Sequence, residues 1–283
     1  MVALASAPAF LILLATFGLP IGQTVGLSFS KWQGVGDPKW AGLDNYVGLL
    51  TNPDFFHSVL ISFFFTILST LGIVLVALFM AVAVSRRARG DETLRAIWFL
   101  PAIAPAAAVA VFWSISVQPM TGIVNAILGA VGLGNDHAWL ASPNTAIFVI
   151  VFVTIWSSVA FPFLLLLGAI DRVPVDVYEA ARIDGAGDWQ QARYFTLPLI
   201  QPVLAMVTVL ELIWTFNAFT LVWATTKGGP ADSTNILPVM LYKLGFQNGD
   251  FGSAAAIGVL GSVFLLAIGM VSLRLVRTRT DES

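Results

Sequence analysis

The sequence predicts an all-α membrane protein with six transmembrane helices, and three observations lead to that fold class. The chain of 283 residues is 58% hydrophobic and only 11% charged, whereas soluble domains carry about 25% charged residues. Six apolar stretches provide the roughly 20 residues that a helix needs to cross the bilayer core. These stretches are continuous rather than alternating in polarity, which favours helices over a β-barrel.

The six expected spans form a single transmembrane domain over residues 1–283. They cover residues 4–27, 59–84, 96–117, 146–170, 199–222 and 254–276. The first stretch is too long for the apolar core of a signal peptide, and no basic segment precedes it. We therefore interpret it as an uncleaved span.

The distribution of basic residues predicts the orientation of the spans. The linkers after spans two and four and the C-terminal tail carry ten arginines, whereas the opposite side carries four lysines. Because basic residues favour the cytoplasmic side, both termini are expected to face the cytoplasm. Tryptophans near span ends are expected to act as interfacial anchors. The arginines are Arg86, Arg87, Arg89, Arg95, Arg172, Arg182, Arg193, Arg274, Arg277 and Arg279, and the lysines of the opposite side are Lys31, Lys39, Lys227 and Lys243. The tryptophans near span ends are Trp32, Trp40, Trp98 and Trp139.

The composition argues against several classes of function. The chain has no cysteine, and its two histidines, His57 and His137, are far apart, so we expect no metal site. A formal net charge of −2 argues against a nucleic-acid partner. The lysines are followed by Trp, Trp, Gly and Leu, so the phosphate-binding pattern Gly-x-x-x-x-Gly-Lys-Ser/Thr is absent. We expect no catalytic residue and no cofactor in this chain.

Span five carries the polar residues that are candidates for a solute pathway. Glu211 is an acidic residue expected within the membrane, where carboxylates usually face a bundle interior or a cavity. In a continuous helix, Trp214, Asn217 and Thr220 would share one face, and Trp223 follows them. Aromatic planes, an amide and a hydroxyl suit a sugar or polyol. The alternative is that these groups only join span five to its neighbours. Trp156 and Ser157 are weaker candidates.

The linker over residues 171–198 is expected to form two helices rather than a loose tether. Pro174 suits the first turn of a helix over residues 175–184, and Gly185 stands where a glycine cap belongs. Asp188 is expected to cap a second helix, with Gln191 completing a capping box, and Pro198 is expected to end it. A small apolar side is expected to fit a groove in a partner protein. It consists of Val177, Ala180, Ala181 and Ala186.

The same linker resembles a known motif. The run Glu179-Ala180-Ala181, Asp184-Gly185-Ala186 and Phe195-Thr196-Leu197-Pro198 is similar to the EAA loop of bacterial ABC importer permeases, in its carbohydrate-importing form. Phe195 departs from the isoleucine of the motif. The segment from Trp214 to the Gly228-Gly229-Pro230 turn resembles permeases for sugars and glycerol phosphate.

The resemblance implies a division of labour. It implies that the chain is one half of a heterodimeric permease in a prokaryotic inner membrane. Two copies of an ATPase subunit, which use ATP and Mg, would dock on the loops, and an extracytoplasmic binding protein would deliver the solute. The coupling residues implied are Glu179, Ala180, Ala181, Asp184, Gly185, Ala186, Phe195, Leu197 and Pro198.

Three alternatives stay open from the sequence. One is an ion-coupled secondary transporter that uses Glu211. The second is an intramembrane enzyme, although no catalytic set of residues is visible. The third is an importer for another solute, such as glycerol phosphate or a peptide. The outward linkers hold few arginines, which argues against a phosphate clamp.

Overall fold

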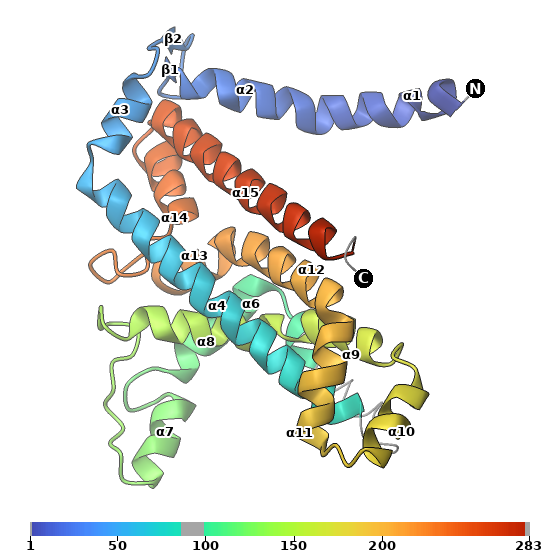
Figure 1. The fold of residues 1–283 in the computed structure, drawn as a ribbon. Helices are drawn as coiled ribbons and strands as arrows, with labels where there is room; N and C mark the ends of the chain where they lie inside the picture. The colour runs from blue at the N-terminus through green and yellow to red at the C-terminus, as the bar shows by residue number, and fades with distance from the viewer. Residues whose placement is uncertain (1, 86–98, 281–283) are drawn as a thin grey trace. The chain divides into compact units, whose positions relative to one another are not determined.

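The computed structural model describes the backbone of residues 2–85 and 99–280 and the side chains of residues 8–85 and 99–270. These parts of the chain are mainly helical, with one two-stranded ribbon (Figure 1). The described elements are α1 (Val2–Leu13), α2 (Leu19–Ser28), β1 (Ser30–Lys31), β2 (Lys39–Trp40), α3 (Asp44–Leu50), α4 (Pro53–Ser85), α6 (Ala106–Ser116), α7 (Ile123–Ala130), α8 (Ala146–Ser158), α9 (Ala160–Ile170), α10 (Val175–Ile183), α11 (Asp188–Gln191), α12 (Leu197–Phe216), α13 (Phe219–Thr226), α14 (Leu237–Tyr242) and α15 (Phe251–Thr280).

Within the described ranges, four helical runs are long and apolar enough to cross a membrane. They are Pro8–Ser28, Pro53–Ser85, Asp188–Phe216 and Phe251–Met270. A fifth candidate is the pair α8 and α9, which is bent by 47°. Val159 links the two helices, and Pro162 lies in the first turn of α9, where its missing N–H disturbs the helix least. The structure thus confirms a helical membrane protein with four to five candidate spans.

The third expected span, residues 96–117, begins outside the described residues, as do Trp98 and the arginines at positions 86, 87, 89 and 95. From Phe99 the chain is helical to Ile103, and α6 then begins at Ala106. Pro105 has extended backbone angles and no N–H, which prevents one helix from running through this point. The part of the third expected span that the structure describes is therefore interrupted at Pro105.

The chain divides into two compact units, and the first contains residues 1–60 and 235–267. In it, β1 pairs antiparallel with β2, with Ser30 opposite Trp40. The buried Asn45 of α3 donates from Nδ2 to the carbonyl oxygens of Ser28 and Ser30, at 2.9 Å each. This amide satisfies two carbonyls where α2 ends and fixes α3 against the ribbon.

The start of α15 is packed tightly onto the same corner of the first unit. The backbone N–H of Phe251 donates to the carbonyl oxygen of Trp32 at 3.1 Å, and the two rings lie 5.2 Å apart. A β-carbon at Gly252 would collide with the carbonyl oxygen of Ser30 and lie 2.9 Å from Nδ2 of Asn45. A residue without a side chain is therefore required at position 252 by close approach of two backbones.

We expect Gly252→Ala to destabilise the first unit by about 1–3 kcal/mol, since overpacking of a tight contact costs this much. Thermal unfolding of the purified protein in detergent measures the effect. Gly48→Ala in α3 is the matched control, because a β-carbon there meets nothing within 4 Å. Equal melting temperatures for the two variants would contradict the tight packing at Gly252.

The second unit contains residues 61–234 and 268–283. Its core is built from α4, α9 and α12, whose apolar side chains bury one another. The members of this core cluster are Ala77, Met80, Ala81, Val84, Val159, Phe163, Leu166, Leu167, Ile170, Ile200 and Val207. Many other large apolar side chains remain exposed, including Phe79, Phe112 and Leu164. Such exposure is expected for a protein whose solvent is partly lipid.

The segment between α6 and α8 folds around a buried amide that the sequence did not indicate. Asn125 of α7 is fully buried and donates to the carbonyl oxygens of Gln118 at 2.9 Å and His137 at 3.0 Å. The side-chain oxygen Oδ1 of Asn125 accepts the indole N–H of Trp139 at 3.0 Å. The polar edge of Trp139 is thus used inside the protein, which limits its expected role as an interfacial anchor.

Candidate functional site

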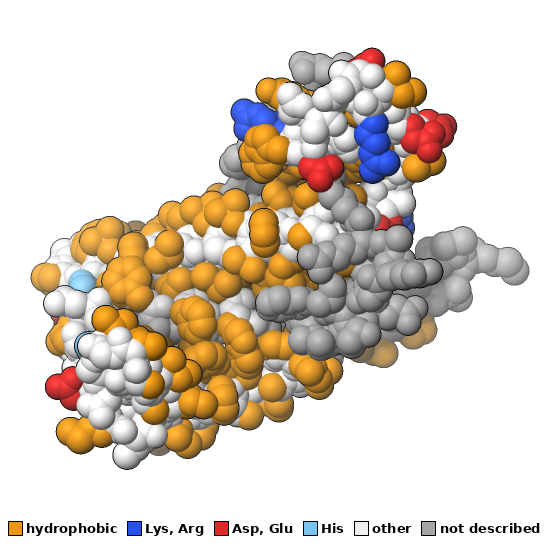
Figure 2. Space-filling view, turned by 90° about the horizontal axis from the view of Figure 1, so that it is seen from below, with side chains coloured by type: hydrophobic (Ala, Val, Ile, Leu, Met, Phe, Trp, Pro, Cys, Tyr) orange, Lys and Arg blue, Asp and Glu red, His pale blue; other side chains and the backbone are white. Residues whose placement is uncertain are grey.

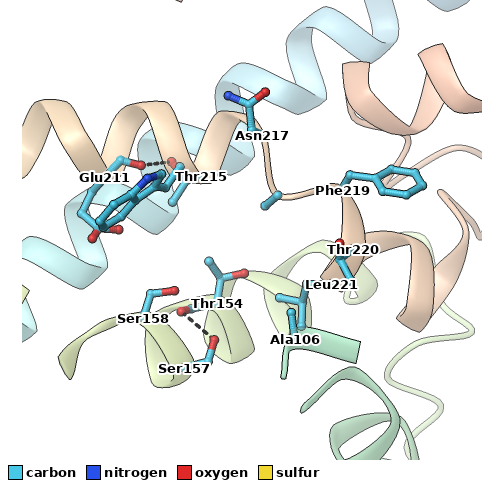
Figure 3. Close-up of a pocket in the computed structure, with 12 residues that line it drawn as sticks. Ala106, Thr154, Ser157, Ser158, Glu211, Thr215, Asn217, Phe219, Thr220 and Leu221 are labelled. Carbon is cyan, nitrogen blue, oxygen red and sulfur yellow. Dashed lines mark hydrogen bonds between the residues drawn. The ribbon is translucent and has the colours of Figure 1, made fainter. Parts of the chain in front are cut away.

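A cavity of about 240 Å³ lies within the second unit, between α12, α13, α8 and the start of α6 (Figure 3). Its walls combine hydroxyls, one amide, aromatic rings and one carboxylate. The lining residues are Ala106, Thr154, Ser157, Ser158, Glu211, Trp214, Thr215, Asn217, Ala218, Phe219, Thr220 and Leu221. Of the expected pathway residues, Glu211, Trp214, Asn217 and Thr220 line it. Ser157 joins them, whereas Trp156 and Trp223 are not among the lining residues.

The expectation of a continuous helix over residues 199–222 is wrong. Helix α12 ends at Phe216, and α13 begins at Phe219. The side chain of Asn217 donates from Nδ2 to the carbonyl oxygen of Ile213 at 2.8 Å, and the N–H of Phe219 donates to the carbonyl oxygen of Asn217 at 2.7 Å. Asparagine side chains compete with backbone groups in this way and end helices.

The break changes how the polar residues come together. Trp214 and Asn217 belong to the end of α12, while Thr220 belongs to α13, so the three do not share the face of one helix. They still meet because both sides of the break line the cavity (Figure 3). Irregular backbone at membrane depth is tolerated where it lines a cavity. Trp223 instead stacks on Phe219, with ring centroids 5.8 Å apart.

Glu211 is the one ionisable side chain among the described residues that line the cavity, and it is only 1% exposed. Next to it, the hydroxyl of Thr215 donates to the carbonyl oxygen of Glu211 at 2.6 Å. The same hydroxyl lies 3.0 Å from Oγ1 of Thr70 on α4. Hydroxyls of α8 form the facing wall (Figure 3). Trp214 is half exposed, and its ring lies 5.4 Å from that of Phe161.

The linker over residues 171–198 folds as a helix, a glycine turn and a second helix. Helix α10 begins after Pro174, which is its N-cap residue. At its other end Gly185 has a φ of +81°, a left-handed conformation that favours glycine. The N–H of Gly185 donates to the carbonyl oxygen of Arg182 at 3.0 Å, and that of Ala186 donates to the carbonyl oxygen of Ala181 at 2.9 Å. These paired bonds form a Schellman cap.

The expected start and end of the second helix are both wrong. Gly187, not Asp188, is the N-cap residue, and its N–H donates to Oε1 of Gln190 at 2.8 Å. Pro198 does not end the helix, because the run Asp188–Phe216 is continuous over 29 residues. A π-helical turn, Ala192–Thr196, lies directly before Pro198. Such wider turns accompany interruptions of the regular bonding pattern, which makes room for a residue without an N–H.

The two helices of the linker are tied together by polar contacts. The hydroxyls of Tyr178 and Thr196 lie 3.1 Å apart, and Nε2 of Gln191 donates to the carbonyl oxygen of Ala186 at 2.8 Å. Ala181 is 1% exposed. The expectation that Ala181 belongs to an outward apolar side is therefore wrong, while Ala180 is exposed.

Large apolar side chains nevertheless project from this linker. Ile183 is 86% exposed and Trp189 is 73% exposed, on either side of the turn at Gly185. Tyr194 and Val175 are also exposed. Figure 2 shows charged side chains gathered on the part that carries α10 and α11, in contrast to the mainly hydrophobic surface of the other helices in this view. The linker thus presents apolar groups within a polar surface, on α10 and at the start of the run Asp188–Phe216.

Residues 73–282 match the model of the family described as "Binding-protein-dependent transport system inner membrane component". The chain belongs to this family. It is a permease subunit of an ATP-binding-cassette importer and a multi-pass membrane protein. Family membership argues against the alternatives of a secondary transporter and of an intramembrane enzyme, since the family consists of transport subunits that are generally not catalytic.

Similar permeases in this family are known from bacteria and archaea. The chain is 30% identical to the probable ABC transporter permease protein YurN of Bacillus subtilis, over 97% of this chain and 95% of YurN. It is 30% identical to the trehalose/maltose transport system permease protein MalF of Thermococcus litoralis, over 97% and 92%. It is 31% identical to the sn-glycerol-3-phosphate transport system permease protein UgpA of Salmonella choleraesuis, over 96% and 92%.

Solved structures agree with the family fold. A chain of a bacterial alginate ABC transporter, in complex with an alginate pentasaccharide-bound periplasmic protein, superposes with a TM-score of 0.86 at 23% identity, over 97% of this permease and 93% of that chain. A second structure, of a bacterial ABC transporter involved in alginate import, gives a TM-score of 0.82 at 25% identity, over 96% and 93%. The permease therefore has the fold of these importer subunits.

Proposed function

We propose that this permease forms half of the pathway for a sugar or related polyol, and that the cavity at the end of α12 is its solute site. The observation that carries the proposal is the continuous helix from Asp188 to Phe216. It begins in the linker that resembles a docking motif and ends at the cavity. At about 1.5 Å per residue, a helix of this length spans roughly 40 Å, so movement at one end reaches the other.

The lining of the cavity suits a polyhydroxylated solute. Trp214 is half exposed and offers an aromatic plane, on which the apolar face of a sugar ring can stack. Asn217 and the hydroxyls of Thr154, Ser157 and Thr220 offer hydrogen-bond partners around it. Mixed walls with a few placed polar groups are typical of small-molecule sites. Permeases named for trehalose/maltose and diacetylchitobiose among the relatives support a carbohydrate solute.

The linker over residues 171–198 is proposed as the docking loop for a separate ATPase, which uses ATP and Mg. Its exposed apolar residues Ile183 and Trp189 would enter a groove in that partner, and Glu179 would pair with a basic group at its edge. The Schellman cap and the Tyr178–Thr196 contact support transmission of motion as a rigid body. Closure of the ATPase dimer on ATP would then displace α12 and change which side of the membrane the cavity faces.

The assembly and topology follow from the same proposal. The permease would pair with a second permease subunit as a heterodimer, bind two copies of the ATPase and receive solute from an extracytoplasmic binding protein. The complex would sit in a prokaryotic inner membrane, with six spans per permease and both termini cytoplasmic. The arginine-rich side of the sequence supports the cytoplasmic termini, and the candidate spans among the described residues support a chain that crosses the membrane several times.

Reconstituted transport tests the proposal. Proteoliposomes with the complete complex should accumulate solute only when ATP and the binding protein are present on their proper sides. The permease pair without the ATPase should show no uptake, even under an imposed proton gradient. Gradient-driven uptake by the permease pair without the ATPase would contradict the proposed coupling of transport to ATP.

The role of the cavity has its own test. We expect Asn217→Ala to raise the solute concentration for half-maximal ATPase stimulation by about two- to tenfold, since a hydrogen bond contributes about 0.5–1.5 kcal/mol. Trp223→Phe is the matched control, because Trp223 lies on the same segment but does not line the cavity. An equal solute response in Asn217→Ala and Trp223→Phe would show that Asn217 packs in the protein without binding the solute.

A further inference from the structure

Only one of the described side chains that line the cavity can carry a charge. Glu211 is its one ionisable side chain, and no lysine, arginine or histidine is among its described lining residues. Apart from Glu211, the polar side-chain groups are the hydroxyls, the single amide and the indole N–H of Trp214, all of them uncharged. The carboxylate side chain is 1% exposed, so bulk water does little to screen it.

We propose that the cavity selects its solute by charge. It accepts a neutral sugar or polyol, or a positively charged amino sugar, and it rejects sugar acids and sugar phosphates. This inference rests on the proposed function of the cavity as the solute site. It separates the permease from relatives named for glycerol phosphate and from the structures named for the acidic polysaccharide alginate.

The exclusion of anions follows from desolvation. A carboxylate or phosphate that enters a protein cavity loses water and must be compensated by positive charge. Arginine and lysine normally supply that charge, arginine through paired hydrogen bonds. The described lining of the cavity holds neither. Glu211 supplies no positive charge in either protonation state, and in its ionised state it repels an anion directly.

The helix break does not replace the missing cation. The first turn of α13 carries a partial charge of about +0.5, which by itself would attract an anion. The last turn of α12 carries about −0.5, and only Asn217 and Ala218 separate the two helix ends. The two opposite ends therefore largely cancel, and Glu211 decides the sign of the local potential.

Three hexose probes of similar size and different charge test the inference. The complete importer without its binding protein is titrated in lipid nanodiscs with glucose, glucosamine and glucuronate. Binding is read as the change in tryptophan fluorescence that is lost in a Trp214→Phe complex. We expect glucosamine to bind at least as tightly as glucose, and glucuronate to bind at least tenfold more weakly than glucose.

Substitution of the carboxylate separates charge from shape. Glu211→Gln keeps the size of the side chain and is expected to reduce the discrimination between glucose and glucuronate about tenfold. Asp136→Asn removes the same charge from a residue that does not line the cavity, and should change none of the three affinities.

The outcomes distinguish this inference from the proposed function. Glucuronate binding as tight as glucose binding in the native complex would overturn charge selection and leave the solute site in place. Unchanged discrimination in Glu211→Gln would overturn the role of this carboxylate. A fluorescence signal from none of the three probes would overturn the assignment of the cavity as the solute site, and the inference with it.

Discussion

Replacement of Gly185 by proline is expected to abolish both uptake and solute-stimulated ATP hydrolysis by the assembled importer, while the chain still enters the membrane. Gly185 has a φ of +81°, whereas proline is fixed near −65°. Proline also lacks the N–H that Gly185 donates to the carbonyl oxygen of Arg182. Proline therefore loses both the left-handed conformation and the hydrogen bond of residue 185. The expected cost is about 1–3 kcal/mol for the backbone strain and about 1 kcal/mol for the bond.

The effect is expected to be large because the turn sets the angle between α10 and the long helix to the cavity. Without the cap, motion of a docked ATPase would bend the linker instead of displacing α12. The measurement is ATPase activity and solute uptake in proteoliposomes, with membrane insertion checked by the yield of purified complex.

Two substitutions serve as controls for this prediction. Gly185→Asn should keep at least half of the uptake, since asparagine tolerates the left-handed conformation better than other residues do. Gly187→Ala should cost only part of the uptake, because Gly187 has a φ of −69° that any residue adopts and the change only weakens an N-cap. Native-level uptake by Gly185→Pro would show that the turn at Gly185 does not transmit motion from the ATPase to α12.

Local signals explain which parts of the docking loop could be predicted from the sequence. A proline before a helix, and a glycine after it, act through the backbone of their own residue, so Pro174 and Gly185 could be placed without knowing the fold. The prediction that Pro198 ends the second helix was wrong, because the effect of this proline depends on the adjacent π-helical turn, Ala192–Thr196. No single residue in the sequence indicates that turn. The prediction for Ala181 was wrong for another reason, since a small apolar residue can lie either on the inner or on the outer side of a helical pair.

The cavity shows the limit of periodicity in membrane helices. Glu211, Trp214, Asn217 and Thr220 could be selected by their chemistry, and all four line the cavity. Their spacing suggested one face of one helix, and the break at Asn217 was hidden because apolar residues continue on both sides. Thr154 and Ser158 could not be singled out, since hydroxyl residues are tolerated throughout membrane helices and only packing decides which of them meet.

Replacement of Ile183 by aspartate is expected to remove the ATPase from the purified permease, because Ile183 is the most exposed large apolar residue on the docking loop, at 86%. Burial of an isoleucine in a partner groove contributes about 1.5–3 kcal/mol, and an unpaired carboxylate in the same groove adds a desolvation cost. At about 1.4 kcal/mol for each tenfold in affinity, we expect at least 100-fold weaker binding. Titration of the ATPase onto permease nanodiscs measures it.

The chain offers two matched controls for this prediction. Ile183→Met keeps a large apolar side chain and should retain binding within about threefold. Ile127→Asp makes the same change at an isoleucine of α7 that is 59% exposed but lies outside the docking loop, and should leave ATPase affinity unchanged. If Ile183→Asp bound the ATPase as tightly as the native permease, the exposed apolar residues would not form the docking surface. Because Ile183→Asp acts on binding and Gly185→Pro acts on transmission, only the Gly185→Pro complex should retain a bound ATPase that no longer responds to solute.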